Sequence, residues 1–511
     1  MNDKVIKGKE CRFAVYVAPP SYEQPDLHFV KELTHYTDGT TKPTINLLYD
    51  FQRPFWVVKK GMRNYKQPKE WIDKDFTNEY KSSQAKLIEN AAKALGTPWF
   101  RGHMRLLHEN PFLFGTDIKS TAIVKKAYMD KYPDLKTPFS VCMLDVETDV
   151  LYGTDEIIMM TIFYQNQCIT VVTKKAVEGH YDVIKKVDGL MKKYLDDYIV
   201  QLKAIAVEKR KKNPDEPDLG EYLEKLNIQS ETIVVDNEID VIKTIFDKVH
   251  KLMPDFVSIW NLDFEVTKFI AACERACVDP ADIFSDPNVP PQYRYFNYKR
   301  GPSQKVTASG LVTPIKPAMR WHTVQCPASF YFIDAMCTYR HTRMGKQEKQ
   351  SYSLDAILKD ELSLGKLTFT EADAYTKLKW HQFMQENYML EYLIYNRFDC
   401  ITMHLLEEKV KDVSVVMVQF SGTSDFEDFK SQPRRAVDQL HWFVADRGKV
   451  MGTTSNELVD EFADDTLGTE EWIVALPAPL ITQAGLNLLQ EDSNHRTNIY
   501  GSVGDLDVSA S

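Results

Sequence analysis

The sequence of 511 residues is 43% hydrophobic and 27% charged, which is ordinary for a globular protein and enough for a sizeable core. Its 63 basic and 73 acidic residues give a formal net charge of −10, which argues against non-specific coating of a polyanion but allows a local nucleic-acid groove. No apolar stretch approaches the roughly 18 residues of a membrane span, and the first residues lack a signal-peptide core, so we expect no membrane contact. The eight cysteines form neither a disulfide framework nor a zinc pattern, which predicts a cytoplasmic protein in a reducing environment.

A chain of 511 residues suggests about three domains of roughly 150 residues each. The first, residues 1–137, is predicted to be rich in strands, because residues 13–17, 45–49 and 55–58 have strand composition. An amphipathic helix is expected over residues 82–95. We therefore predict a mixed domain at the start of the chain.

The second predicted domain, residues 138–412, carries the candidate chemistry. Residues 142–146 are a short apolar run between polar residues, which favours a buried strand. Asp145 and Glu147 are two positions apart, so on a strand they point to the same face, where repulsion and desolvation disfavour both charges. A pair of divalent metal ions would compensate for this, whereas the alternative is a strand end in solvent.

A hairpin and a long helix follow this strand. Residues 157–164 and 168–173 are two apolar runs separated by three polar residues, which predicts an antiparallel hairpin. Residues 182–212 are charged and helical in period, and we expect an exposed insertion with no assigned function. Residues 234–253 are predicted to form a strand and then a helix.

Two further acids follow the predicted strand 256–260. The strand stops at Asn261, and Asp263 and Glu265 lie where a helix begins. Acids at the carboxyl end of a strand and the amino end of a helix lie where open sheets build ligand sites. The alternative is that Asp263 only caps the helix.

The last candidate acid is Asp399, on a predicted helix that continues through residues 392–406. Tyr395 and Asp399 are four positions apart and therefore lie one turn apart on one face. A carboxylate so placed can hold a metal ion while the phenol orients a water nucleophile. The alternative is an ordinary amphipathic helix.

Taken in order, the three acidic motifs resemble the exonuclease motifs of the DnaQ-like 3′-to-5′ exonuclease superfamily. The flanking residues are similar to the proofreading domain of family B DNA polymerases in a bacteriophage-like version, and this resemblance covers most of the chain. The supporting segments resemble the amino-terminal domain, the exonuclease hairpin and the stretch between the second and third motifs; they are residues 48–51 with 53–55, residues 293–311, and residues 334–340, 352–358 and 364–366.

The resemblance implies an α/β, α+β multidomain protein. Its parts would be a strand-rich amino-terminal domain, an RNase H-like exonuclease domain and the start of a polymerase palm. It further implies two Mg²⁺ ions, for which Mn²⁺ can substitute, acting on the single-stranded 3′ end of a primer-template DNA. One ion would activate water that Tyr395 orients, and the other would stabilise the departing 3′ oxygen. The implied ligands are Asp145, Glu147, Asp399 and an acid of the second motif.

The second motif departs from the family pattern. The family places Phe-Asp after the asparagine, whereas here the nearest match is Phe264-Glu265, with Asp263 two positions before the glutamate. Glu265 keeps the apolar register of the helix but carries an extra methylene group. Asp263 has the expected side chain at an unexpected spacing. We list both as catalytic candidates and expect Asp263 to be the metal ligand.

The third stretch, residues 413–511, begins with a predicted helix over residues 434–443. Its last residues, 503–511, resemble the first palm motif, in which Asp507 would hold the metals of nucleotidyl transfer. The sequence stops before the Tyr-Pro that follows in the family. We therefore expect the amino-terminal half of a split family B polymerase, working in a host cell cytoplasm with other replication proteins. A carboxyl-terminal half would supply the palm, fingers and thumb. The rival explanation of this interrupted motif is an artificially shortened polymerase chain.

Two alternatives to the split polymerase remain open. One is a stand-alone 3′-to-5′ exonuclease, against which the palm-like tail argues. The other is a non-catalytic subunit for DNA binding and assembly, which the irregular second motif suggests.

Overall fold

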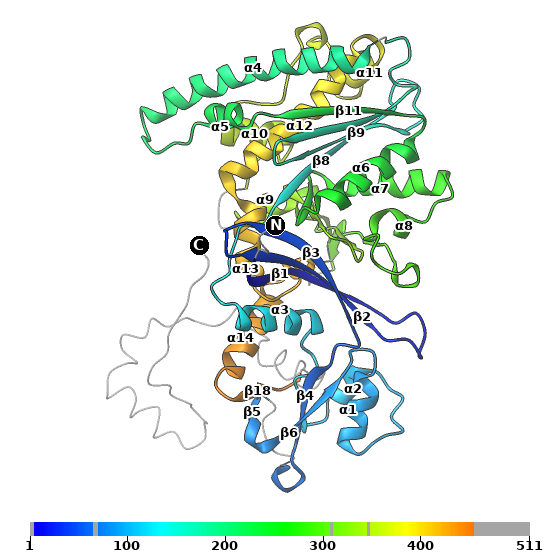
Figure 1. Ribbon diagram of the computed structural model, residues 1–511, viewed down its shortest axis with the longest axis vertical. Coiled ribbons are helices and arrows are strands. Elements are labelled where there is room, and N and C mark those ends of the chain that lie inside the picture. The colour runs from blue at the N-terminus through cyan, green and yellow to red at the C-terminus, as the bar shows by residue number, and fades with distance from the viewer. Residues whose placement is uncertain (1–4, 65–69, 181, 307–309, 345–347, 454–511) are drawn as a thin grey trace.

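The structure, a computed structural model, describes residues 5–64, 70–180, 182–306, 310–344 and 348–453. The chain is mixed α/β, as expected, with several sheets and helices (Figure 1). A six-stranded sheet lies at the centre of the larger part of the molecule. Its strands, in spatial order, are β11 (Gln229–Val235), β10 (Gln167–Thr173), β9 (Ile157–Tyr164), β8 (Val141–Thr148), β12 (Phe256–Ile259) and β17 (Tyr331–Asp334).

The strand directions bring most carboxyl ends of this sheet to one edge. β12 is parallel to both β8 and β17, and β10 is parallel to β11. β9 runs antiparallel to β8 and β10, so the predicted hairpin is confirmed. Residues that follow β8 and β12 therefore meet at one edge, where ligand sites of open sheets are commonly built.

Helices cover both faces of the central sheet. Because side chains alternate along a strand, Met143 of β8 packs on one face while Cys142 and Leu144 pack on the other. The first face carries α4 (Val183–Arg210), α10 (Leu354–Leu362), α11 (Leu378–Asn387) and α12 (Met389–Val410). The second face carries α6 (Glu238–Leu252), α7 (Leu262–Arg275) and α8 (Pro280–Phe284). The sheet is thus the middle of three layers.

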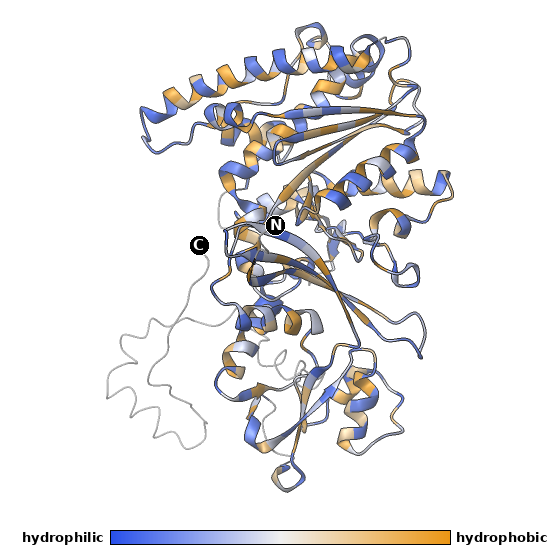
Figure 2. Cartoon of the chain, in the orientation of Figure 1, coloured by the Kyte–Doolittle hydropathy of each residue, from blue (hydrophilic) through white to orange (hydrophobic). Residues whose placement is uncertain are grey.

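Helix α4 corrects one expectation. It covers the range predicted to be helical, but it is not simply an exposed insertion, because Val187, Tyr198 and Leu202 are buried against the layer that contains α12. Figure 2 shows its hydrophilic and hydrophobic residues alternating along the helix. None of the described helices combines the length and hydropathy that crossing a bilayer requires. The apolar stripe of α4 therefore serves as an outer wall for the core around α12.

The amino-terminal part of the chain is rich in strands, as predicted. A three-stranded antiparallel sheet consists of β1 (Ile6–Val17), β2 (Leu27–Tyr36) and β3 (Thr41–Tyr49). A second small sheet has the order β6 (Thr77–Ser82), β4 (Arg53–Val58) and β7 (Leu113–Phe114). Two helices of this amino-terminal part are α1 (Leu87–Leu95), inside the predicted range, and α3 (Ser120–Lys131), which packs on β1.

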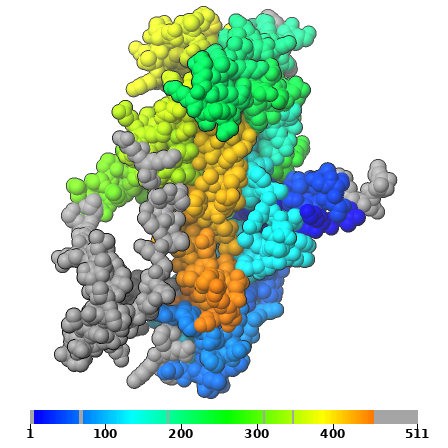
Figure 3. Space-filling view, turned by 90° about the vertical axis from the view of Figure 1, so that its left-hand side faces the viewer, coloured from blue at the N-terminus to red at the C-terminus, as the bar shows by residue number. Residues whose placement is uncertain are grey.

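Residues 413–453 return to this amino-terminal part. The predicted helix is α14 (Gln432–Ala445), and the following strand β18 (Lys449–Met451) pairs antiparallel with β5 (Trp71–Asp73). In Figure 3 the orange segment that contains α14 lies against blue residues of the amino-terminal part. The palm-like residues 503–511, with Asp507, lie outside the described residues.

A buried ionic junction joins the amino-terminal sheet to the central sheet. Asp255, next to β12, forms ion pairs with Arg12 of β1 and Lys31 of β2, both at 2.9 Å. Its carboxylate also accepts hydrogen bonds from the Ser140 amide at 2.8 Å and hydroxyl at 3.0 Å. Burial alone would raise the pKa of Asp255, but the two cations hold it well below its usual range. Burial lowers the pKa of Lys31 to about 8, so Lys31 and Asp255 each depend on the other to keep their charge.

We expect Asp255→Asn to destabilise the fold by about 3–5 kcal/mol, because it leaves the buried Lys31 without its counter-charge and Arg12 with Glu10 alone. Urea unfolding at neutral pH measures this loss. The matched control is Asp282→Asn, since Asp282 pairs with Arg294 at 3.5 Å with its side chain 64% exposed. This exposed pair should contribute less than about 1 kcal/mol. Equal effects of the two substitutions would contradict the role of the buried junction.

Candidate active site

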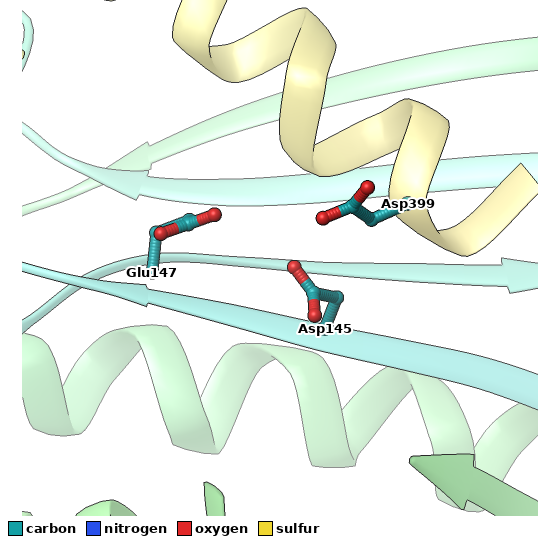
Figure 4. A group of neighbouring side chains, drawn as sticks. All are labelled: Asp145, Glu147 and Asp399. Carbon is teal, nitrogen blue, oxygen red and sulfur yellow. The ribbon is translucent and has the colours of Figure 1, made fainter. Parts of the chain in front are cut away.

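Three carboxylates converge at the carboxyl end of β8. Asp145 and Glu147 come from β8 and Asp399 from α12, and one carboxylate oxygen of each lies within 4.8 Å of the others. Figure 4 shows the three side chains pointing toward one another in the space between strand and helix. The structure therefore brings together the acids of the first and third predicted motifs.

The local fold explains this convergence. Asp145 and Glu147 share the face of β8 that Met143 also uses, which is the face covered by α12. β12 pairs with β8 only as far as Met143, so among the described strands the outer half of β8 has no neighbour on that side. The first turn of α7 follows β12 directly, which brings its acids to that end of β8.

Helix α12 also supplies hydrogen-bond donors for both β8 acids. The Asn396 amide donates to Asp145 Oδ2 at 2.6 Å. The Tyr392 hydroxyl donates to Glu147 Oε2. Both donors lie on the face of α12 that carries Asp399, at helical spacings of three and seven residues from it. One helix therefore positions its own acid and the acids of the strand.

Lys366 is a functional candidate that the sequence analysis gave no role. Its ammonium donates to Asp399 Oδ2 at 2.6 Å and to the Tyr395 hydroxyl at 3.0 Å. Its backbone amide donates to Asp355 Oδ1 at 3.0 Å, and a side chain at Gly365 would collide with that same carboxylate. The segment Leu364-Gly365-Lys366 stands out in the sequence, but its partners come from α10 and α12. A single lysine forms no periodic pattern from which these partners could be predicted.

Glu265, and not Asp263, is the buried acid of α7 whose charge interacts with the acid group. Glu265 is 5% exposed, and its Oε2 has no hydrogen-bond partner within the described part of the chain. The charge of Glu147 acts on Glu265, and that of Glu265 acts on Asp145. Asp263 Oδ1 instead accepts hydrogen bonds from the Tyr298 hydroxyl at 2.6 Å and from Arg300 Nε at 3.0 Å.

This placement favours Glu265 over Asp263 as the metal-ligand candidate of the second motif, and both remain predictions. Residues two positions apart on a helix point roughly 200° apart, so only one of the two acids of α7 can face β8. Burial would raise the pKa of Asp263, but the hydrogen bond from Tyr298 and the nearby cations lower it below its ordinary value. Asp263 therefore keeps its charge in a separate polar contact with β13 (Asn297–Lys299).

The acid group is electrostatically strained. Burial, followed by the charges of Asp399 and Glu147, raises the pKa of Asp145 well above its usual range. Burial is also the main cause that raises the pKa of Glu147 to about 7 and the pKa of Glu265 well above its usual range. The Lys366 ammonium offsets part of this charge. The negative charge that remains favours the binding of cations.

Divalent metal ions fit this group of acids. Carboxylate oxygens are the ligands that Mg²⁺ prefers. Asp399 Oδ1, like Glu265 Oε2, is buried and has no hydrogen-bond partner among the described residues. Asp145, Glu147, Glu265 and Asp399 are therefore the residues that could hold such ions.

A second group of acids does not have this character. The carboxylates of Asp425, Glu427 and Asp428 also lie within 4.8 Å of one another. The ammonium of Lys119 forms ion pairs with all three, at 3.0, 3.0 and 2.7 Å. Because a side chain already supplies the counter-charge, we assign this group a structural role.

We expect Glu147→Gln to stabilise the metal-free protein at pH 8. The pKa of Glu147 is about 7 in the folded state against an ordinary value of 4.5, so the folded state binds the proton more tightly. The stability contributed by this group therefore falls as the pH rises from about 4.5 to about 7, and the amide should regain on the order of 2 kcal/mol above that range. Thermal and urea unfolding in EDTA at pH 5 and pH 8 measure the gain, which should be small at pH 5.

Two controls accompany this experiment. Glu371→Gln, at an exposed position, should change stability equally at both pH values. Saturating Mg²⁺ should stabilise the wild-type protein more than Glu147→Gln, because a ligand that binds only the folded state adds to its stability. A Glu147→Gln protein that gains no stability at pH 8 would show that the acid group is not strained.

No protein-family model matches this sequence, and no curated protein resembles it significantly. What the chain does must therefore be inferred from its own residues and from the geometry into which they fold. That geometry is a group of buried carboxylates, with an ammonium and a phenol beside it, at one end of a central sheet.

Proposed function

We propose that this chain is a metal-dependent 3′-to-5′ DNA exonuclease of the proofreading type found in family B DNA polymerases. The observation that carries the proposal is the convergence of Asp145, Glu147 and Asp399 at one end of β8, with the buried Glu265 near enough for its charge to raise the pKa of Asp145. These are the acids of the three motifs, which lie far apart in the sequence. The order and directions of the strands around β8 are compatible with the RNase H-like domain that the resemblance implies.

Each group of residues at the site would have its own role. Asp145, Glu147, Glu265 and Asp399 would hold two Mg²⁺ ions, which when bound supply activation of water and stabilisation of the departing 3′ oxygen. The Tyr395 hydroxyl, held by Lys366 at 3.0 Å, orients the attacking water through a hydrogen bond. The Lys366 ammonium places a fixed positive charge beside Asp399. Burial of Glu147, Glu265 and Asp399 limits the access of bulk water to these interactions.

A single-stranded DNA end suits the surroundings of the acids. The ring of Phe264, next to Glu265, is 43% exposed and is available to stack on a base. Lys268 lies over that ring at 5.0 Å, and Arg300 is nearby on Asp263, so cations accompany the aromatic face. Stacking and phosphate contacts bind a strand without reading its sequence. A mismatched 3′ end, which unpairs at lower cost, would reach the site more often.

The wider proposal concerns DNA synthesis. The resemblance of residues 503–511 to a palm motif suggests that the chain works with a second polypeptide that carries the palm, fingers and thumb. Co-expression of such a polymerase half, followed by co-purification and a primer-extension assay, tests this part separately. If no such half co-purifies with the chain or supports primer extension, the stand-alone nuclease becomes the better account.

We expect the native chain with Mg²⁺ to shorten a 5′-labelled single-stranded DNA from its 3′ end. The double substitution Asp145→Ala with Glu147→Ala should lower the rate by about 10²-fold or more, because it removes two ligands of the metal centre. Gel analysis of the labelled ladder measures both. If the native chain digests no DNA, even with a polymerase half present, the non-catalytic assembly subunit becomes the better account.

The second motif gives a sharper test. Glu265→Gln should lower the exonuclease rate by about 10²-fold or more, whereas Asp263→Asn on the same helix should keep most of the activity. Each substitution replaces one carboxylate by an amide, and the two positions lie on different sides of α7. Single-turnover rates at saturating Mg²⁺ measure the difference. The reverse order of effects would restore Asp263 as the ligand.

A further inference from the structure

A chain of hydrogen bonds leads from α11 to the carboxylate of Glu147. The Nδ1 atom of His381 lies 2.8 Å from the Tyr392 hydroxyl, which donates to Glu147 Oε2. Tyr392 is fully buried, and His381 lies at the edge of the site with its side chain 33% exposed. Neither residue belongs to the three acidic motifs.

When Glu147 is ionised, as a metal ligand must be, the directions of these hydrogen bonds follow from the number of protons available. A tyrosine hydroxyl has one proton, and Tyr392 uses it toward Glu147. The oxygen of that hydroxyl must then accept from His381, so the proton of the imidazole ring lies on Nδ1. The ring nitrogen is 3.7 Å from Glu147 Oε2, which is beyond hydrogen-bond distance. His381 therefore acts on Glu147 through Tyr392.

Packing holds both rings in place. The ring of Tyr392 lies parallel to that of Tyr395, with centroids 6.0 Å apart and an angle of 3° between the planes. The ring of His381 meets Trp380 edge to face at 4.9 Å. Between the two helices, the Trp380 ring packs on Tyr395 at 4.8 Å and the His381 ring on Tyr392 at 5.8 Å, which joins α11 to the face of α12 that carries the candidate chemistry. The hydroxyl of Tyr392 is thus presented to Glu147 from a fixed position.

We propose that Tyr392 and His381 are positioning residues that orient Glu147 for a divalent metal ion. With one carboxylate oxygen engaged by Tyr392, the other oxygen is left for the ion. A glutamate has three rotatable side-chain bonds, and ordering it costs conformational entropy unless a neighbour already holds it. Hydrogen-bond partners of metal ligands typically contribute 10- to 100-fold to metal affinity. This inference rests on the proposed function, because it assumes that Glu147 is a ligand.

The competing explanation is purely structural. A buried tyrosine hydroxyl needs a hydrogen-bond partner, and Glu147 could serve only that need. Loss of stability alone cannot separate the two roles. Metal affinity can, because a structural role would leave it unchanged in the protein that remains folded.

The test measures the affinity of the full chain for Mn²⁺, without DNA, by electron paramagnetic resonance. We expect Tyr392→Phe to weaken Mn²⁺ binding about 10- to 100-fold and to raise the Mg²⁺ concentration for half-maximal exonuclease activity by a similar factor. Much of the maximal rate should return at high Mg²⁺. His381→Leu should weaken binding in the same direction. His381→Asn, which keeps an N–H donor near the position of Nδ1, should restore most of the affinity.

Tyr339→Phe is the matched control. Tyr339 is also buried, and its hydroxyl donates to Glu361 on α10, outside the acid group. This variant should lose stability without losing affinity for Mn²⁺. If Tyr392→Phe and His381→Leu bind Mn²⁺ as the wild-type protein does, the positioning role is wrong. If the wild-type protein itself binds no Mn²⁺, the metal centre is wrong and the inference falls with it. His381 is partly exposed, so its variants remain informative should Tyr392→Phe fail to fold.

Discussion

Mutual repulsion among buried carboxylates at the end of β8 is the constraint that the surrounding structure has to overcome. Burial and neighbouring charges raise the pKa of Asp145 and Glu265 well above the usual range, and Lys366 offsets only part of this effect. Packing of apolar side chains supplies the opposing free energy, at about 1.5–3 kcal/mol for each large side chain that is fully buried. The apolar residues of α12 on the sheet, together with α4 behind them, provide many such side chains. The long α4 is therefore part of what keeps the acids together.

Helix α12 is fixed by polar contacts as well as by packing. Arg397 is fully buried, and its guanidinium donates to Thr170 Oγ1 at 2.9 Å and to Thr232 Oγ1 at 2.6 Å, on β10 and β11. On another face of the same helix, Asn396 and Tyr392 donate to the acids of β8. A shift of α12 along the sheet would separate both sets of partners and leave the buried guanidinium without these hydrogen-bond acceptors, which typically costs about 1–3 kcal/mol or more. The positions of Tyr395 and Asp399 follow from this double attachment.

Much of this site is predictable from local sequence. The parts that are not predictable depend on how the elements rotate and pack against one another. The strand with Asp145 and Glu147 and the helix with Tyr395 and Asp399 show clear periodicity, so their elements and facing sides are predictable. Side-chain identity favours Asp263 as the ligand of the second motif, whereas the rotation of α7 turns Asp263 toward Arg300 and favours Glu265. Lys366, and the contact of Tyr392 with Glu147, depend on which elements pack together, and a single sequence does not specify that. The same holds for α4, which we expected to be exposed from its charged composition but which packs on the core around α12.

The two ends of β8 are linked by the fold. Asp255 precedes β12, Ser140 precedes β8, and their hydrogen bonds fix the alignment of these parallel strands at their amino ends. Arg12 and Lys31 of the amino-terminal sheet neutralise Asp255 at that point. The carboxyl ends of the same two strands carry the acids of β8 and lead into α7, where Glu265 lies. An alignment that slipped by one residue would turn Asp145 and Glu147 toward the opposite face of the sheet, into the apolar core under α6 and α7. The amino-terminal sheet therefore contributes to the acid group without touching it, because its buried cations stabilise the alignment on which the geometry of that group depends.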